Sequence, residues 1–312
     1  MAASSPRAPD TATDVEPALP PPRAAKAPRG AAADLAAGRG FAPLVALAAL
    51  ATVAIYLFVS APAPLPAQAG GRPAGATISV ARLFDILNNE NRVARASWTA
   101  DVVGAGKAAG LAFAENWHES AVEAGPLPAL FLRETAGYLE EHGRGLGLFL
   151  GSAYPINTAN RFAGSQVEHA AALQATGEPQ YFFEPTLGRH TAMFADVAVV
   201  DACVTCHNEH PDSPKRDWQR GDMMGATTWM YPDGEVSIDT ALRLVGILRA
   251  GFRATYERYL DKAAGFAVPP VIGAQWPRDG RFLPSADVFM AEHARRAAPT
   301  LEALIRETPE AP

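Results

Sequence analysis

A run of twenty residues without a charged side chain, positions 41–60, limits most strongly how this chain can fold. At about 1.5 Å of rise per residue, a helix of this length matches a bilayer core roughly 30 Å thick. A buried core helix is the alternative, but soluble helices rarely need so long an uncharged stretch. The sequence therefore predicts one transmembrane helix.

The charges that flank this run predict its orientation. Arg23, Lys26, Arg29 and Arg39 precede it, whereas the next cation after it is Arg72. Because cytoplasmic flanks of membrane helices carry the excess of Lys and Arg, we expect a cytoplasmic N-terminus and an exported remainder. This is the arrangement of a single-pass protein of the bacterial inner membrane with its main domain in the periplasm.

A cleaved signal peptide is the competing interpretation, because Ala67-Gln68-Ala69 has the small-x-small form of a cleavage site. The uncharged run exceeds the roughly 7–15 apolar residues of a signal peptide, so we favour an uncleaved anchor. The predicted parts are a disordered cytoplasmic tail (1–40), the transmembrane helix (41–60), a flexible linker (61–76), a periplasmic domain (77–262) and a C-terminal extension with a final helix (263–312).

The exported part alternates between helical and strand patterns. Apolar spacing predicts helices over 77–98, 126–141, 162–175, 237–259 and 286–307, with a glycine-rich break or small-residue packing face at 101–113. Short apolar runs bounded by glycine and proline predict strands at 147–150, 180–185, 191–200 and 223–231. These patterns indicate an α+β fold with an antiparallel sheet.

Charge and cysteine content exclude several classes of protein. With 27 Lys and Arg against 33 Asp and Glu, the net charge is −6, which argues against a nucleic-acid binder. The sequence contains two cysteines, Cys203 and Cys206. One such chain cannot build a disulfide scaffold or an all-cysteine zinc or iron–sulfur site, so the two cysteines act as a pair.

Residues 203–207 read Cys-Val-Thr-Cys-His, the CxxCH attachment signature of a c-type haem. Two thiols three residues apart can reach the two vinyl groups of one porphyrin, and the next imidazole then falls under the iron. Covalent attachment takes place on the exported side of the membrane, where the flanking charges put this domain. The sequence therefore predicts one covalently attached haem c, held by Cys203 and Cys206, with His207 as metal ligand.

Three other interpretations of the motif compete with haem attachment. A plain disulfide suits an oxidising compartment, whereas a thioredoxin-like pair needs a βαβ context that the predicted elements do not supply. A zinc site could use Cys203, Cys206, His207 and His210, but adjacent Cys206 and His207 rarely aim at one metal. Haem attachment is the interpretation that the motif favours.

The distal haem ligand is open at this level. His190 and Met193 lie on the predicted strand that leads into the motif, and Met223 and Met224 lie on the strand that follows it. These four are the better candidates among the remaining histidines and methionines, although each residue type is usually a core or surface residue.

A longer string carries a family resemblance. Residues 203–222, CVTCHNEHPDSPKRDWQRGD, closely resemble the haem-attachment loop of the PAS-like c-type haem domain family. These Tll-like domains of unknown function occur at the periplasmic ends of bacterial sensor proteins and in some stand-alone cytochromes. Weaker similarity through 147–162 and 102–113 extends the resemblance to about residues 77–232.

The resemblance implies a PAS-like antiparallel sheet with flanking helices, thioether bonds at Cys203 and Cys206, and His207 as proximal ligand. Some relatives use a further cysteine as distal ligand. Both cysteines of this chain are already committed, so its sixth ligand is another residue, water or none. Cationic candidates for binding the haem propionates are Arg161, Lys215 and Arg216.

We therefore expect a membrane-anchored, single-haem protein that senses redox state or a gas ligand. A tail of forty residues cannot fold an output domain, so such a sensor works with a separate signalling protein. The alternative is an electron-transfer cytochrome that serves a periplasmic redox partner. A haem enzyme is the third class, but no distal catalytic pair is recognisable in the sequence.

Overall fold

The computed structural model describes residues 45–53 and 76–300. The chain divides into two units after Ala69, and each is considered by itself. In the first unit, residues 45–53 are helical, and the Thr52 hydroxyl donates to the Ala48 carbonyl at 2.8 Å. The other residues of the predicted span, the tail at 1–40 and all but the last residue of the linker lie outside the described residues.

Within residues 45–53 and 76–300, no helix combines the length and apolar character needed to cross a bilayer.

The second unit contains a four-stranded antiparallel sheet in the order β4-β7-β6-β5. Its strands are β4 (Gly147–Gly151), β5 (Gln180–Glu184), β6 (Arg189–Val197) and β7 (Met223–Tyr231). All four predicted strands are confirmed. β6 ends at Val197, earlier than the predicted residue 200, and its register with β7 shifts at Asp196/Val197.

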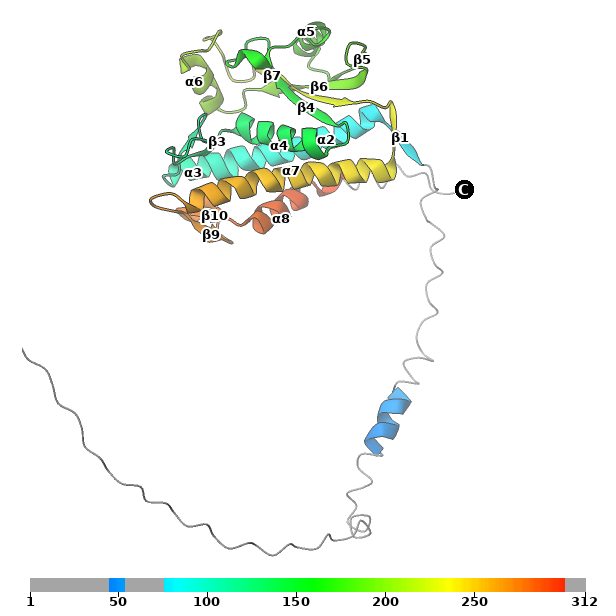
Figure 1. Ribbon diagram of the computed structural model, residues 1–312. Helices are drawn as coiled ribbons and strands as arrows, with labels where there is room; N and C mark the ends of the chain where they lie inside the picture. The colour runs from blue at the N-terminus through cyan, green and yellow to red at the C-terminus, as the bar shows by residue number, and fades with distance from the viewer. Residues whose placement is uncertain (1–44, 54–75, 301–312) are drawn as a thin grey trace, which may run out of the picture. The chain divides into compact units, whose positions relative to one another are not determined.

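Helices are arranged in layers around this sheet (Figure 1). The helices are α2 (Val80–Ser97), α3 (Ala105–Ala108), α4 (Pro128–His142), α5 (Gln166–Thr176), α6 (Asp201–Glu209), α7 (Ile238–Ala264) and α8 (Ala286–Arg296). α2 and α4 cover one face of the sheet and α5 the other, while α7 packs beneath α2 and α4, and α8 beneath α7. The predicted α+β class is confirmed.

Three two-stranded pairs were not predicted, because each strand has only two or three residues. β1 (Thr77–Ser79) pairs antiparallel with β8 (Glu235–Ser237). The parallel pairs are β2 (Phe113–Ala114) with β3 (Gly125–Pro126), and β9 (Val271–Gly273) with β10 (Phe282–Pro284). Short 3₁₀ turns occur at Thr158–Asn160 and Pro277–Asp279.

Helix starts follow local capping chemistry. α2 begins after Ser79, whose hydroxyl accepts from the Arg82 N–H at 3.2 Å, so the predicted helix over 77–98 starts later. Ser237 opens α7 as expected, with its hydroxyl 3.1 Å from the Thr240 nitrogen. α5 starts at Gln166 instead of 162, because Phe162 is committed to the apolar core beside the sheet.

The predicted break at 101–113 is only partly right. The chain continues from α2 into a π-helix, Trp98–Gly104, and then into α3 before it turns at Gly110, which has a φ of 82°. A small-residue packing contact is present, because a Cβ on Gly106 would lie 3.0 Å from the Phe113 ring. Gly106 therefore serves packing, and Gly110 forms the turn after α3 has ended at Ala108.

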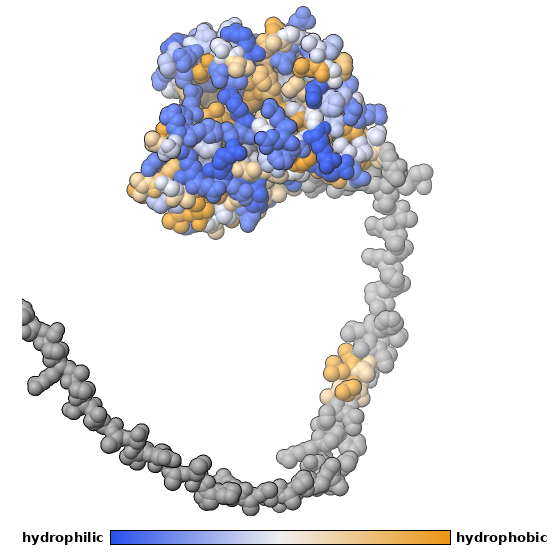
Figure 2. Space-filling view, in the orientation of Figure 1, coloured by the Kyte–Doolittle hydropathy of each residue, from blue (hydrophilic) through white to orange (hydrophobic). Residues whose placement is uncertain are grey.

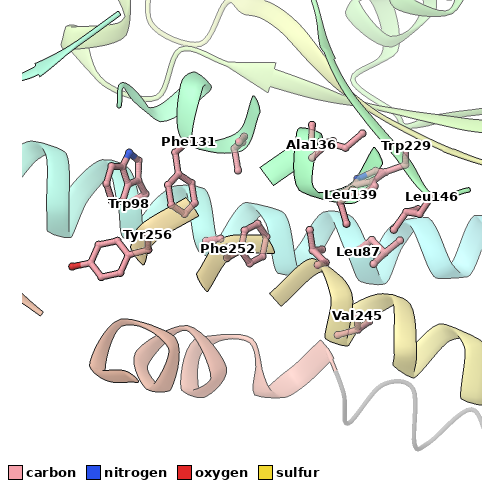
Figure 3. Close-up of a cluster of buried hydrophobic side chains, with 14 of the residues drawn as sticks. Leu87, Trp98, Phe131, Ala136, Leu139, Leu146, Trp229, Val245, Phe252 and Tyr256 are labelled. Carbon is pink, nitrogen blue, oxygen red and sulfur yellow. The ribbon is translucent and has the colours of Figure 1, made fainter. Parts of the chain in front are cut away.

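The main core lies between the helices (Figure 3). Trp98 stacks on Phe131 with ring centroids 4.5 Å apart, and its indole N–H donates to the Pro126 carbonyl at 3.2 Å. Tyr256 of α7 stacks on Phe289 of α8 at 4.4 Å. The described part of the predicted extension, through Thr300, thus packs into the same core.

The predicted final helix over 286–307 is described only through residue 300, and α8 ends at Arg296. The surface in Figure 2 is largely hydrophilic over the helices, with apolar groups at the β9–β10 end. Exposed apolar side chains of that segment include Val268, Val271 and Ile272.

Candidate functional site

The CxxCH residues lie on helix α6, which is part of the connection between β6 and β7. The sequence analysis predicted no helix over these residues. On a helix, Cys203, Cys206 and His207 occupy positions i, i+3 and i+4 and therefore share one face. The motif presents both thiols and the imidazole from one short rigid element.

The two cysteines are unbonded, with Cys203 half-buried and Cys206 exposed. Partial burial and the nearby Glu115 carboxylate raise the pKa of the Cys206 thiol. Catalytic Cys-x-x-Cys pairs contain a cysteine whose pKa is lowered, which stabilises its thiolate. In addition, β6 and β7, the strands before and after α6, are antiparallel neighbours and do not form a βαβ unit. A thioredoxin-like role is thus unsupported.

His207 is half-buried, and its ring meets the Trp218 ring edge-on with centroids 6.5 Å apart. Burial, with a smaller effect of His210, lowers the pKa of His207. Its Nδ1 is buried and has no hydrogen-bond partner among the described residues. A neutral imidazole with unused nitrogen capacity is the form that a metal ligand requires.

The segment after α6 is fastened to it by Asn208. The Asn208 side chain donates to the Trp218 carbonyl at 3.0 Å and accepts from the Trp218 N–H at 2.9 Å. Lys215 lies over the Trp218 ring, 4.6 Å from its centroid. These contacts give a structural reason for the long string 203–222 and set the buried indole beside His207.

Trp218 also lines a cavity of about 440 Å³. Its walls come from the segment after β4, α5, the Lys215–Asp222 loop and the start of β7; lining residues include Tyr154, Arg161, Phe162, Lys215 and Trp218. Cys203, Cys206 and His207 do not line it. The volume falls within the roughly 300–1,000 Å³ range of small-molecule and cofactor sites.

The four candidate distal ligands divide between different environments. Met223 and Met224 line the cavity. Met193 is fully buried in the apolar cluster with Phe162 and Leu173. His190 lies at the opposite end of β6 from α6, packed against Phe183 with ring centroids 5.1 Å apart, so it is not brought to this site.

The cationic candidates also divide. Arg161 and Lys215 line the cavity, whereas Arg216 donates to the Pro211 carbonyl at 2.7 Å and does not. Arg161 donates to the Ala153 carbonyl at 3.3 Å, at the cavity wall. Two of the three predicted cations therefore line the cavity, and one of them, Lys215, is also ion-paired with Asp217.

His210, the fourth ligand of the alternative zinc site, binds other groups of the protein. His210 contacts Glu115 through Nε2 at 3.2 Å, and its Nδ1 accepts from the Asp212 N–H at 3.2 Å. Both ring nitrogens are thus occupied within the protein. In the described ranges, no group of three or more His, Cys, Asp and Glu side chains could hold a metal ion.

Sequence reasoning missed an ion pair beside the motif. Arg95 of α2 binds Asp196 at the end of β6, and Asp196 influences the pKa of His207. Glu115, which binds His210, acts on His207 in the same direction. The sequence carried no signal for the ion pair, since 101 residues separate its partners.

Comparison with protein families relates this geometry to other proteins. A family model described as Tll0287-like matches residues 77–232. The chain belongs to the Tll0287-like family. The Tll0287-like match covers half of the chain and includes the sheet, the cavity and α6, whereas α7 and α8 follow it. Searches of curated proteins and of solved structures each gave no significant match.

Proposed function

We propose that this chain is a c-type haem protein, with thioether bonds at Cys203 and Cys206 and His207 as an axial ligand. One observation carries the proposal: both thiols and the imidazole share one face of α6, where the His207 ring meets Trp218. When bound, a haem supplies a redox-active iron whose potential depends on its ligands and burial.

The residues around α6 fit this group. The lowered pKa keeps His207 neutral and able to bind a metal, and its buried Nδ1 has no protein partner in the described part of the chain. Arg161 and Lys215 would bind carboxylates of the haem through charge-assisted hydrogen bonds. Met223 and Met224 are the remaining candidates for a second axial position.

We propose further that the domain is PAS-like and senses redox state or a gas ligand. It would be anchored in the inner membrane by residues 41–60, face the periplasm and act on a separate signalling protein. The contacts of α2 support this proposal, because α2 packs against the sheet on one side and against α7 and α8 on the other. A change at the sheet can therefore reach the helical layer that forms most of the core.

A periplasmic electron carrier is the second candidate. The exposed Cys206 side chain favours it, because electron transfer needs a haem edge near the surface. Such a protein would exchange electrons with a soluble redox partner and would need no conformational change.

Haem attachment is tested on the full chain, produced in cells that attach haem to exported proteins. We expect a haem stain that survives denaturation, and its loss in the Cys203→Ala/Cys206→Ala variant. His207→Ala should retain the stain but shift the Soret band, whereas the matched His210→Ala variant should leave the band unchanged. A covalent stain in the double variant would refute the proposed attachment.

An absorption spectrum with and without carbon monoxide separates the two functions. A sensor should show a high-spin ferrous state or bind the gas readily, because its sixth position is open or labile. A low-spin spectrum in both oxidation states that does not respond to carbon monoxide would instead support an electron carrier with two strong axial ligands.

A further inference from the structure

Exposed apolar side chains gather toward two ends of the second unit. Figure 1 shows β5 toward the end where β1 lies, and β9 and β10 toward the other end. Clustered apolar side chains on a surface mark contact sites more often than scattered ones do. The group at the β9–β10 end is Val268, Val271 and Ile272. The group at the β5 end, called the β5 patch, is Tyr181, Phe183 and Leu187, with 43%, 50% and 55% of their surface exposed.

The β5 patch is held in a fixed shape. Tyr181 and Phe183 are two positions apart on β5 and therefore point to the same face of the strand. Leu187 follows in the turn at 185–188, where Gly188 has a φ of 62°. The patch is formed before any partner arrives, so little conformational entropy is lost when it binds.

Charge does not interrupt the β5 patch. Within residues 180–188, all of which the structure describes, the one charged side chain is Glu184. Its carboxylate accepts from the Ser165 hydroxyl and, at 3.1 Å, from the Thr186 N–H, and only 7% of Glu184 is exposed. Edge strands usually carry exposed charges that oppose contacts. In this edge strand the charge is turned inward and leaves the apolar side chains outside.

The β5 patch adjoins the first described residues of the second unit. The Phe183 ring packs on His190 with centroids 5.1 Å apart, and a Cβ on Gly234 would lie 3.1 Å from the His190 Nε2. The Gly234 carbonyl accepts from the Val80 N–H at 2.9 Å, directly after β1. A short series of contacts therefore joins the patch to the residues that follow the linker.

The length of the linker limits how far this end of the unit can be from the predicted span. Residues 61–76 lie between the span and β1, and a chain of that length extends to at most about 55 Å. The β9–β10 end lies beyond the 27 residues of α7, which add about 40 Å. Short flexible connections raise the effective concentration of a linked surface to about the millimolar range. Even a weak contact at the β5 end is therefore favoured.

We propose that the β5 patch inserts into the periplasmic face of the bilayer that residues 41–60 span. This inference rests on the proposed membrane anchor and does not depend on haem attachment. Aromatic side chains favour the interface between lipid head groups and acyl chains, and aliphatic side chains enter the adjoining acyl region. Insertion gives the domain a second attachment and fixes which end of its sheet faces the membrane.

Photolabelling tests the contact on the full chain. The protein is reconstituted in phosphatidylcholine vesicles that contain a lipid with a diazirine in its acyl chain, and mass spectrometry locates the label after irradiation. We expect label in residues 41–60 and in residues 180–188. Residues 266–276, the apolar segment at the other end of the unit, should carry none.

Matched variants connect the label to the patch. Phe183→Ser/Leu187→Ser should reduce the label in residues 180–188 by about tenfold, because it removes the apolar surface of two half-exposed side chains. Val268→Ser/Val271→Ser removes equally exposed side chains at the other end and should leave that label unchanged. Undiminished label in a Phe183→Ser/Leu187→Ser chain with wild-type circular dichroism would overturn the inference. If that chain does not fold, Leu187→Ser alone changes an exposed turn and should reduce the label about threefold.

Failure of this inference is distinguishable from failure of the proposed function. Absence of label from residues 41–60 would refute the anchor and the contact with it. Label in 41–60 without label in 180–188 would refute the contact alone, as would label in 266–276 instead. A β5 patch that is covered by a second copy of the chain would also remain unlabelled, and mass photometry would then show a dimer.

Discussion

At the scale of single residues, β4 and β7 approach closely at two glycines, Gly151 and Gly225, of which Gly225 lines the cavity. A Cβ on Gly225 would lie 2.4 Å from the Gly151 carbonyl oxygen, and a Cβ on Gly151 would lie 2.3 Å from the Phe162 ring. A backbone oxygen in a paired strand cannot move aside as a flexible side chain can. Close approach of the two strands therefore requires glycine at 225.

Gly225→Ala should destabilise the protein by about 1–3 kcal/mol, the usual range for overpacking. Gly246→Ala is the matched control, because an added Cβ in the middle of α7 meets nothing within 4 Å. That change should stabilise the protein by about 0.5–1 kcal/mol, through helix propensity. Urea unfolding measures both, and a neutral Gly225→Ala variant would show that the strands can separate.

The residue scale also shows what the sequence could predict about the site. Cys203, Cys206 and His207 stand in one short motif, so spacing alone made them candidates. Met223 and Met224 became candidates because they lie on the strand that follows the motif. The effect of Asp196 and Glu115 on His207 was not predicted, because it depends on how distant segments pack. A single sequence does not record such packing.

At the scale of elements, α2 is joined to α7 and α8 through a buried carboxylate. Glu90 has no exposed surface; it accepts from Arg249 at 2.7 and 2.8 Å and contacts His293 at 2.8 Å. Burial alone raises the pKa of Glu90, but the bonds to His293 and Arg249 outweigh it, so the pKa is lowered. A charged glutamate is therefore built into the interface of three helices.

Glu90→Gln should cost about 3–5 kcal/mol of stability, because it leaves the partly buried Arg249 without its counter-charge inside the helical interface. Glu257→Gln is the control, since it breaks only the exposed pair with Arg253 within α7 and should cost less than about 1 kcal/mol. Both values come from urea unfolding at neutral pH. Equal losses in the two variants would contradict a special role for Glu90.

The same carboxylate predicts a dependence of stability on pH. Because the folded-state pKa lies below the ordinary 4.5, the unfolded chain takes up the proton first as the pH falls. The contribution of Glu90 is complete above pH 4.5 and is lost as the pH falls through the lowered folded value. The unfolding free energy of the wild type should therefore fall more steeply with acid than that of Glu90→Gln, and parallel curves would contradict this.

At the scale of the whole molecule, the family match and the folded unit have different ends. The match stops at residue 232, but α7 then supplies Leu248, Phe252, Tyr256 and Tyr259 to the core, all with 0% exposure. α8 adds Phe289 to the same aromatic cluster. Without these helices, the faces of α2 and α4 that point away from the sheet would be open to water.

A chain that ends after Pro232 should therefore lack a cooperative thermal transition. Circular dichroism during heating measures this against the full chain. A truncated chain that melts sharply near the same temperature would show that the sheet, α2 and α4 are stable by themselves. The comparison also shows whether the segment after the family match is part of the folding unit.

The overall architecture was predictable in part. Strand positions followed from apolar runs between glycines and prolines, and α7 followed from its long amphipathic period and the Ser237 cap. The β1–β8 pair and the π-helix were not predictable. A three-residue strand and one wide helical turn leave no periodic pattern, because partners far along the chain stabilise them.

The β1–β8 pair has a mechanical consequence. Two further hydrogen bonds extend its ladder, from Val80 N–H to the Gly234 carbonyl and from Ile238 N–H to the Ala76 carbonyl. The ladder joins the first residues of the second unit's folded part to the start of α7. A pull applied upstream of Thr77 would load this ladder first. Tension would pass to α2 only after the ladder ruptured, so β1 and β8 would protect α2 from a force applied to the preceding chain.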